Sequence, residues 1–266
     1  MSTLLDANRI TSLCRAARNG LLIEVVAETA STNTDLRQRL EHLSGPVLRV
    51  AERQSAGRGR AGRSWRAAPG DSLCFSLAWP CTRGVGRLTG LPLAVGVAIA
   101  AALRTHDYPV MLKWPNDLLL GGAKLGGVVV ETSTGRRDAQ SPLWVVIGVG
   151  LNTHPNHERD NDLPHPVAAL AQRVDRDALL ALLADALVDM LAQFDREGLG
   201  PFIDRWQQWD AYAGHSVMVT DQDTLLHEGI ARGIDASGCL QLATAAGVIA
   251  VAAGDVSLRV RLNGEA

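Results

Sequence analysis

The chain has 266 residues with a formal net charge of -2, and 47% of its residues are hydrophobic. This length allows one large domain, or one domain with a smaller companion, around a substantial core. The near-neutral charge and the 4% content of aromatic residues argue against a protein devoted to nucleic acid, which relies on basic surfaces and aromatic stacking. The cysteines form no CxxC pair, so we expect no structural zinc and a reducing cytosol.

The longest uncharged apolar run covers residues 88–103 and is interrupted by Pro92 and Gly96. A membrane span needs about 20 residues, so this run predicts a buried helix. The first residues of the chain lack the basic start, apolar centre and cleavage site of a secretion signal. We therefore expect a cytoplasmic protein that does not span a membrane.

The hydrophobic pattern predicts both strands and helices up to residue 194. Ser31 or Thr32 can cap a helix that starts there. Turn residues at 115–116 and 121–122 separate short apolar pieces, as in a meander of antiparallel strands. In chain order we expect strands at 21–26, 47–51 and 72–79, the helix at 88–103, strands at 110–114, 118–120, 125–131 and 144–151, and an amphipathic helix at 175–194.

The character of the sequence changes after Trp209. Short β-like runs with Gly and Asp turns fill residues 216–261, without another helical period. We expect an α+β domain over residues 1–213 and a small β-barrel over residues 214–266. Residues 154–166, rich in proline and acids, are typical of a polar surface loop.

Residues 52–65 carry a dense cluster of positive charge. Five arginines lie between Arg53 and Arg66 with no acid among them, and glycines are interleaved with them. Glycine lets the backbone approach a ligand closely, and arginine offers a fork of donors suited to phosphate or carboxylate. We expect this segment to order around an anion. A solvated basic loop or a nucleic-acid patch is the alternative.

Two lysines bracket a predicted hairpin. Lys113 precedes the run Trp114-Pro115-Asn116-Asp117, and Lys124 lies among glycines. One interpretation is a pair of cations that meets a carboxylate and a phosphate. The other is that each lysine only balances Asp117 or Glu131, because lysines on apolar strands commonly pair with an acid.

Gly148 and Gly150 form a GxG pattern within the last predicted strand of the first domain. The pattern lacks the third glycine and the following helix of a dinucleotide-binding fingerprint. A β-bulge or close strand packing explains it equally well.

Together these motifs resemble those of the biotin protein ligases, and the resemblance spans nearly the whole chain. It implies an α+β fold: a catalytic domain of the class II aminoacyl-tRNA-synthetase and biotin-ligase type with a mixed antiparallel sheet, followed by an SH3-like β-barrel. The matching motifs occur in the family's order: Ser31-Thr32-Asn33, the glycine–arginine motif at 57–65 that ends in Trp65, Lys113-Trp114-Pro115-Asn116-Asp117, Lys124 with its glycines, Gly148-x-Gly150-x-Asn152, Arg205-Trp206, and residues 254–259.

The resemblance implies a two-step reaction. Biotin and ATP, the latter accompanied by Mg²⁺, give biotinyl-5′-adenylate and pyrophosphate. The biotinyl group then passes to one lysine of a biotin carboxyl carrier protein, such as that of acetyl-CoA carboxylase. By the same resemblance Lys124 contacts the biotin carboxylate and the α-phosphate, and Arg58 and Arg60 clamp the adenylate. Asp117 orients or deprotonates the carrier's lysine, although an Asp after Pro-Asn is also ordinary turn chemistry.

Two sets of binding residues follow from the resemblance, with no metal ligands. Hydroxyl and amide groups can address the ureido ring of biotin, which offers one acceptor and two donors. The biotin pocket then comprises Ser31, Thr32, Asn33, Gln54, Arg58, Gly59, Arg60 and Lys124. The ATP site comprises Arg60, Arg63, Trp65, Lys113, Asn116 as a nucleotide or magnesium contact, and Asn152 near the adenine.

Family members that are also repressors carry an N-terminal helix-turn-helix domain. Residues 1–30 are too few for that domain and the first strand, so we expect no DNA-binding role. A lipoate-protein ligase shares the fold and the adenylation chemistry, and a non-catalytic biotin-binding protein is an alternative from another class. The glycine–arginine motif and the pentad that starts at Lys113 favour the biotin ligase. Monomer and homodimer both stay open.

Overall fold

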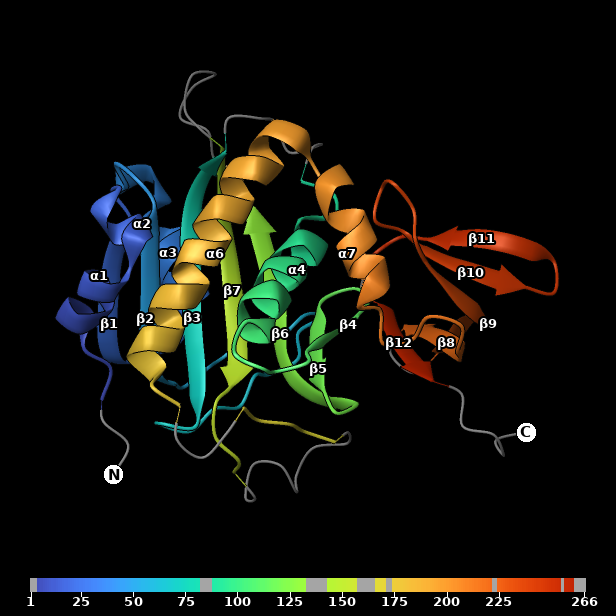
Figure 1. The fold of residues 1–266 in the computed structure, drawn as a ribbon, viewed down its shortest axis with the longest axis horizontal. Helices are drawn as coiled ribbons and strands as arrows, with labels where there is room; N and C mark the ends of the chain where they lie inside the picture. Colours follow the sequence, from blue (N-terminus) through green and yellow to red (C-terminus); the bar gives the residue numbers. More distant parts are fainter. Residues whose placement is uncertain are drawn as a thin grey trace.

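The computed structural model describes residues 4–81, 88–132, 143–156, 166–170, 174–221, 224–254 and 256–260. A seven-stranded sheet with the order β1-β2-β3-β7-β6-β5-β4 forms the centre of the larger part (Figure 1). The β1–β2 pair is parallel and the other neighbouring pairs are antiparallel, so the predicted mixed sheet is confirmed. The strands are β1 (Leu22–Thr29), β2 (Val47–Gln54), β3 (Ser72–Cys81), β4 (Met111–Lys113), β5 (Asp117–Leu120), β6 (Ala123–Thr132) and β7 (Leu143–Asn152).

Helices cover the two faces of this sheet. The helices α4 (Leu91–Arg104) and α6 (Arg176–Glu197) lie on one face and α3 (Thr32–Gln38) on the other (Figure 1). On β7, Ile147 and Val149 belong to the main core, whereas Val146 joins Leu36 of α3 in a smaller cluster. Because successive side chains of a strand point to opposite faces, the even-numbered positions of β7, which include both glycines of the GxG pattern, face the α3 side.

The apolar helix α4 begins at Leu91, later than the expected residue 88. Gly90 has φ +80° at the N-cap, and Pro92 lies in the first turn. A proline is tolerated there because the first N–H groups of a helix have no intrahelical partner. The boundary was wrong because hydrophobicity alone does not reveal where the helical conformation starts.

Several short elements have no counterpart among the predictions. They are α1 (Ala7–Leu13) and α2 (Arg15–Arg18) before β1, η1 (Leu40–His42) after α3, and η3 (Gly200–Phe202) with α7 (Ile203–Gln208) after α6. Helices of this length show too few turns for a periodic signal and depend on tertiary packing. Ser31 is the N-cap residue of α3 by its backbone, but its side chain makes no capping hydrogen bond.

The C-terminal part is a separate antiparallel sheet with the order β11-β10-β9-β8-β12, consistent with the predicted SH3-like domain (Figure 1). Its strands are β8 (Ser216–Asp221), β9 (Thr224–Ile234), β10 (Leu240–Thr244), β11 (Gly247–Val251) and β12 (Val256–Val260). The two parts are joined by hydrogen bonds: the Trp114 indole donates to Gly238 O at 3.1 Å, and Gln207 Nε2 donates to Ile234 O at 3.2 Å.

Two further expectations concern a polar loop with the C-terminal motif and the absence of a membrane span. Most of the polar loop expected at 154–166 lies outside the described residues, as do Asp255 of the C-terminal motif and residues 261–266. Among the described helices none is long and apolar enough to cross a membrane.

Candidate active site

The arginine loop, residues 55–71, connects β2 to β3. Its tip folds as a small hairpin in which Trp65 N donates to Gly57 O at 2.9 Å and Gly59 N donates to Arg63 O at 2.6 Å. A Cβ atom at Gly57 would lie 2.5 Å from Trp65 O, so the hairpin requires glycine at this position. The glycines of the motif thus shape the loop that carries the arginines.

The GxG pattern of β7 makes room for two side chains from elsewhere. A Cβ atom at Gly150 would lie 2.4 Å from the Trp65 ring, and one at Gly148 would lie 2.4 Å from Asn33 Oδ1. The indole ring and the Asn33 amide therefore lie directly on the sheet at these two positions. Close packing explains the pattern: the strand shows no bulge at these residues, and the described residues that follow it directly, 153–156, are not helical.

A buried chain of polar groups connects α3 to β2, β3 and β6. Gln54 Oε1 accepts hydrogen bonds from Thr32 N at 2.8 Å and from Thr32 Oγ1 at 3.1 Å. Ser76 Oγ lies 2.7 Å from Thr32 Oγ1 and donates to Asn33 Oδ1. Asn33 Nδ2 donates to Glu131 Oε2 at 2.8 Å. Three of the residues predicted to form the biotin pocket are thus brought together, and Ser31 is buried next to them.

Both lysines of the chain converge on Asp117. Lys124 Nζ lies 2.7 Å from Asp117 Oδ1, and Lys113 Nζ lies 3.5 Å from Asp117 Oδ2. Glu131, the other candidate acid, instead pairs with Arg37 Nη1 at 2.8 Å. One carboxylate cannot neutralise two ammonium groups, so the site keeps a net positive charge even though each lysine has an acidic neighbour.

The charged state of this cluster follows from burial and from the neighbours. Burial alone would raise the pKa of Asp117, but Lys124 and Lys113 more than offset it, so the pKa lies below its ordinary value of 3.8. Burial lowers the pKa of Lys113, and Asp117 opposes that shift. Asp117 is therefore an ionised and weakly basic carboxylate at neutral pH. It begins β5 opposite Lys113 rather than lying in the turn.

The loop arginines contact the hairpin and the C-terminal sheet. Arg60 Nη1 donates to Asn116 Oδ1 at 3.1 Å, and Arg60 Nη2 donates to Gly254 O. Arg63 Nη2 donates to Ser257 Oγ. Arg58 is exposed, and its guanidinium has no hydrogen-bond or ion-pair partner in the described part of the chain.

Asn152 and Trp65 both lie next to Lys124 of β6. The buried Asn152 amide donates to Ala168 O at 3.1 Å and to Lys124 O at 3.4 Å, so it holds the main chain at Lys124. The Trp65 ring centroid lies 6.0 Å from Lys124 Nζ. Trp65 Nε1 is buried, with no hydrogen-bond partner among the described residues.

Three residues at the site are not among the predicted site residues. Ser76 left a usable signal, because it is a buried polar residue inside the apolar run of β3. Tyr212 has its ring centroid 5.8 Å from Lys113 Nζ, and Ser257 contacts Arg63. Both lie far from the lysines in the sequence. Ser257 belongs to the matched motif at residues 254–259, but that match did not place it at the site.

Two family models and several known proteins are similar to this chain. The model of the biotin/lipoate A/B protein ligase family matches residues 22–152, and that of the biotin protein ligase C terminal domain matches residues 214–259. The chain is 34% identical over 260 residues to the bifunctional ligase/repressor BirA of Salmonella typhimurium, covering 96% of this chain and 79% of that protein.

Two further proteins agree. The biotin–[acetyl-CoA-carboxylase] ligase of Paracoccus denitrificans is 31% identical over 241 residues, covering 87% of this chain and 98% of the relative. The structure of the biotin protein ligase from Aquifex aeolicus in complex with biotin and ATP has a TM-score of 0.74 at 25% identity, covering 90% of this chain and 99% of that one. The sequence, the fold and the convergent lysines lead to one conclusion: this chain belongs to the biotin protein ligase family.

Proposed function

We propose that the cluster of Lys124, Lys113 and Asp117, closed by the arginine loop, is the active site of an ATP-dependent ligase that attaches biotin to a biotin carboxyl carrier protein. The observation that carries the proposal is the convergence of both lysines on one carboxylate. That arrangement leaves positive charge where two anions, the biotin carboxylate and the α-phosphate, must approach each other. The relatives named as biotin–[acetyl-CoA-carboxylase] ligases support the same activity.

In the first step an oxygen of the biotin carboxylate attacks the α-phosphorus of ATP. The new bond joins that oxygen to phosphorus, the bond from the α-phosphorus to the bridging oxygen breaks, and pyrophosphate leaves with the electron pair. Lys124 neutralises both reacting groups, which lowers their repulsion and stabilises charge in the transition state. Arg58 and Arg60 hold the adenylate, since guanidinium forks match phosphate oxygens.

The ureido ring of biotin binds in the buried polar chain. Thr32, Asn33 and Gln54, with Ser31 beside them, provide hydroxyl and amide groups that are already fixed by neighbours. A pocket whose groups are positioned in advance loses less conformational entropy when the ligand binds. Gly59 allows the loop to lie close to the ligand.

ATP binds beside the lysines. Trp65 offers an aromatic face for the adenine together with Asn152, while Lys113 and Arg63 address the phosphates. Among the described residues no three His, Cys, Asp or Glu side chains could jointly hold a metal. A Mg²⁺ ion would therefore come with the phosphates and keep most of its waters, and Asn116, whose Oδ1 accepts from Arg60, would be the protein residue that contacts the nucleotide or the ion.

In the second step the neutral amine of the carrier's lysine attacks the biotinyl carbonyl and forms the amide bond. The bond from that carbonyl to the phosphate oxygen breaks, AMP leaves with the electron pair, and the surplus proton of the amine passes to solvent. Asp117 meets that lysine. Because its pKa is lowered, the carboxylate is a weak base, which favours orientation of the incoming amine over removal of its proton.

The domain division that fits this function is a catalytic domain of residues 1–213 and a C-terminal domain of residues 214–266. We infer that the protein acts in the cytoplasm, without membrane attachment and without a specific DNA site, as a monomer or homodimer. The net charge of -2 supports weak, nonspecific DNA binding at most. A footprint on a defined operator at physiological salt would contradict this.

One assay tests the proposal. Pyrophosphate release from ATP is followed with biotin, with lipoate and with neither acid. Release that requires biotin supports the ligase, release that requires lipoate identifies a lipoate ligase, and absence of release in both cases identifies a non-catalytic protein.

A further inference from the structure

A buried ion pair lies at the base of the arginine loop. Arg176 Nη2 is 2.7 Å from Glu52 Oε2, and the two side chains are only 5% and 7% exposed. A buried ion pair seldom stabilises a fold more than apolar residues of similar volume would, because the lost hydration offsets the attraction. Arg176 is also the first residue of α6, where the helix dipole disfavours a cation. Stability alone therefore does not account for this pair.

Arg176 contacts β2 and β3, the two strands that the arginine loop connects. Glu52 lies just before the end of β2 at Gln54, and Arg176 Nη2 also donates to Ser72 O, at the first residue of β3, at 3.4 Å. One guanidinium thus contacts the strand that leads into the loop and the strand that leads out of it. The pairing of β2 with β3 extends to Ala51 and Cys74, and this contact adds a link beyond that pair, toward the loop.

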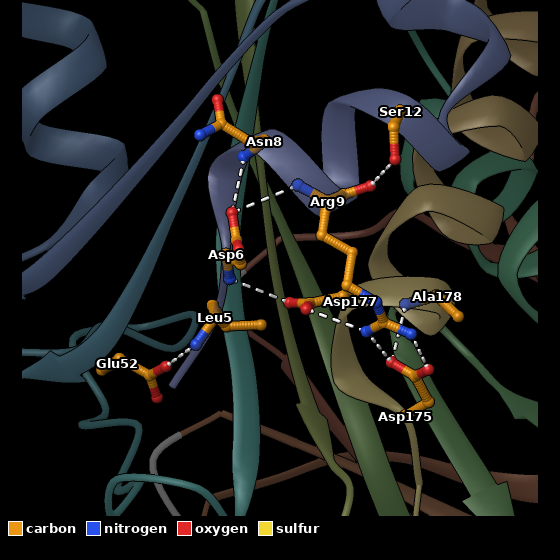
Figure 2. Close-up of polar contacts among 9 residues, drawn as sticks. All are labelled: Leu5, Asp6, Asn8, Arg9, Ser12, Glu52, Asp175, Asp177 and Ala178. Atoms are coloured by element: carbon orange, nitrogen blue, oxygen red, sulfur yellow. Dashed lines mark hydrogen bonds and ion pairs between the residues drawn. The ribbon is translucent and has the colours of Figure 1, made fainter. Parts of the chain in front are cut away.

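The N-terminal segment, residues 4–18, completes the arrangement. Leu5 N donates to the second carboxylate oxygen of Glu52 (Figure 2). Asp6 N donates to Asp177 Oδ1 at 3.1 Å, and Arg9 pairs with both Asp175 and Asp177 at the start of α6 (Figure 2). Both oxygens of Glu52 are therefore occupied, and the segment that occupies one of them is held on the helix that carries Arg176.

One of these loop ends holds a group of the proposed site, and the other contacts the segment that follows β7. Gln54, at the end of β2, is the acceptor for Thr32, and Asp71, next to Ser72, accepts from Asn156 Nδ2 at 2.7 Å. A shift of β2 against β3 would move the Gln54 amide and the root of the loop together. Closely packed interiors transmit such shifts rather than absorbing them.

We propose that Glu52 and Arg176, braced by the N-terminal segment, are positioning residues for biotin binding and for retention of biotinyl-adenylate. They set the spacing between the two ends of the arginine loop from the opposite face of the sheet. This inference rests on the proposed function of the site.

The test compares Glu52→Leu, Arg176→Met and the double variant. Each single variant leaves one buried charge without its partner, so both lower the melting temperature. The double variant removes both charges and keeps a similar volume, so its melting temperature returns to within a few degrees of the parent's. If the pair positions the loop, the double variant still has a biotin KM that is raised by about tenfold to a hundredfold, because the binding groups are misplaced. It also releases the adenylate faster than the parent does. Its kcat at saturating biotin stays close to that of the parent.

The control is the exposed pair of Arg15 and Asp189, which also joins the N-terminal segment to α6. Arg15→Ala and Asp189→Ala leave both the biotin KM and adenylate release unchanged. A double variant of Glu52 and Arg176 whose KM and release rate match the parent's would overturn the inference and leave the pair as packing only. If the parent itself releases no pyrophosphate with biotin, the proposed function fails instead, so the two failures are distinguishable.

Discussion

Asp117 Oδ1 lies 2.7 Å from Lys124 Nζ, and both residues belong to the hairpin of β5 and β6. The hairpin is irregular between Leu118 and Leu119, where the register shifts, and this irregularity lies between the strand positions of the two charged residues. Lys113 reaches the same carboxylate from β4. The cluster that we assign to catalysis is thus built on one short meander, which explains why its residues are close in the sequence.

Lys124→Ala is expected to abolish adenylate formation while the fold stays intact. The lost contact acts on charge that develops in the transition state, where such contacts contribute about 10²- to 10³-fold in rate. Pyrophosphate release measured in a single turnover, with circular dichroism and the melting temperature as checks on folding, tests this. A rate within tenfold of the parent's would make Lys124 a structural partner of Asp117 only.

Asp117→Asn is expected to change how stability depends on pH. A carboxyl group whose pKa is lowered in the folded state contributes stability above its ordinary pKa, here 3.8, and loses it as the pH falls through the lower folded value. At about pH 7 the variant is less stable by about 1–3 kcal/mol, because a neutral amide oxygen replaces the anionic acceptor of two lysines. Urea unfolding at neutral pH and below pH 3.8 should show the gap closing in acid. A gap that does not change with pH would contradict the charged state assigned to Asp117.

The two glycines of β7 should affect different substrates. Gly148→Ala pushes a Cβ atom against Asn33 and should raise the KM for biotin, whereas Gly150→Ala pushes one against Trp65 and should raise the KM for ATP. Gly45→Ala is the control, because nothing lies within 4 Å of its Cβ position and its φ is not in the left-handed region. Steady-state kinetics with each substrate varied in turn tests the split. Equal effects of both variants on both substrates would contradict the separate assignment of the two pockets.

Arg60→Gly is expected to form the adenylate but release it. The substitution removes the contacts of Arg60 with Asn116 and Gly254, so the loop loses this link to the hairpin and one of its links to the C-terminal part, while Arg63 still contacts Ser257. The free mixed anhydride then acylates lysines of bystander proteins, which mass spectrometry of a biotinylated protein mixture detects. Labelling confined to the carrier's lysine in the variant would show that Arg60 does not retain the intermediate.

The Arg60→Gly variant should attach little biotin to its own lysines. Lys113 and Lys124 are the chain's two lysines, and each lies beside Asp117, whereas arginine stays charged and does not react as an amine. An added exposed lysine, Arg15→Lys in the Arg60→Gly background, provides a matched acceptor on the surface. Peptide mapping should find biotin on Lys at position 15 and little on Lys113 or Lys124. Heavy labelling of the two native lysines would show that the cluster opens to solvent.

The sequence by itself determined most of the elements, and it pointed to the residues that we assign to the chemistry. The glycine–arginine motif, the two lysines and the strands from β2 to β7 depend on local composition and on short-range periodicity, which a sequence displays directly. The start of α4 and the short helices α1, α2 and α7 were not predicted, because caps and tertiary contacts decide them rather than hydrophobicity.

Only the tertiary structure decided how these residues meet. The contact of Ser76 with Thr32 and the contacts of Arg60 and Arg63 with the C-terminal sheet join residues far apart in the chain. The pair of Glu52 and Arg176 is a further case, since each looks like an ordinary surface charge in its own segment. Such pairs form because folding buries both charges in the same place, and a buried charge needs a partner. No local pattern records which partner the fold will supply.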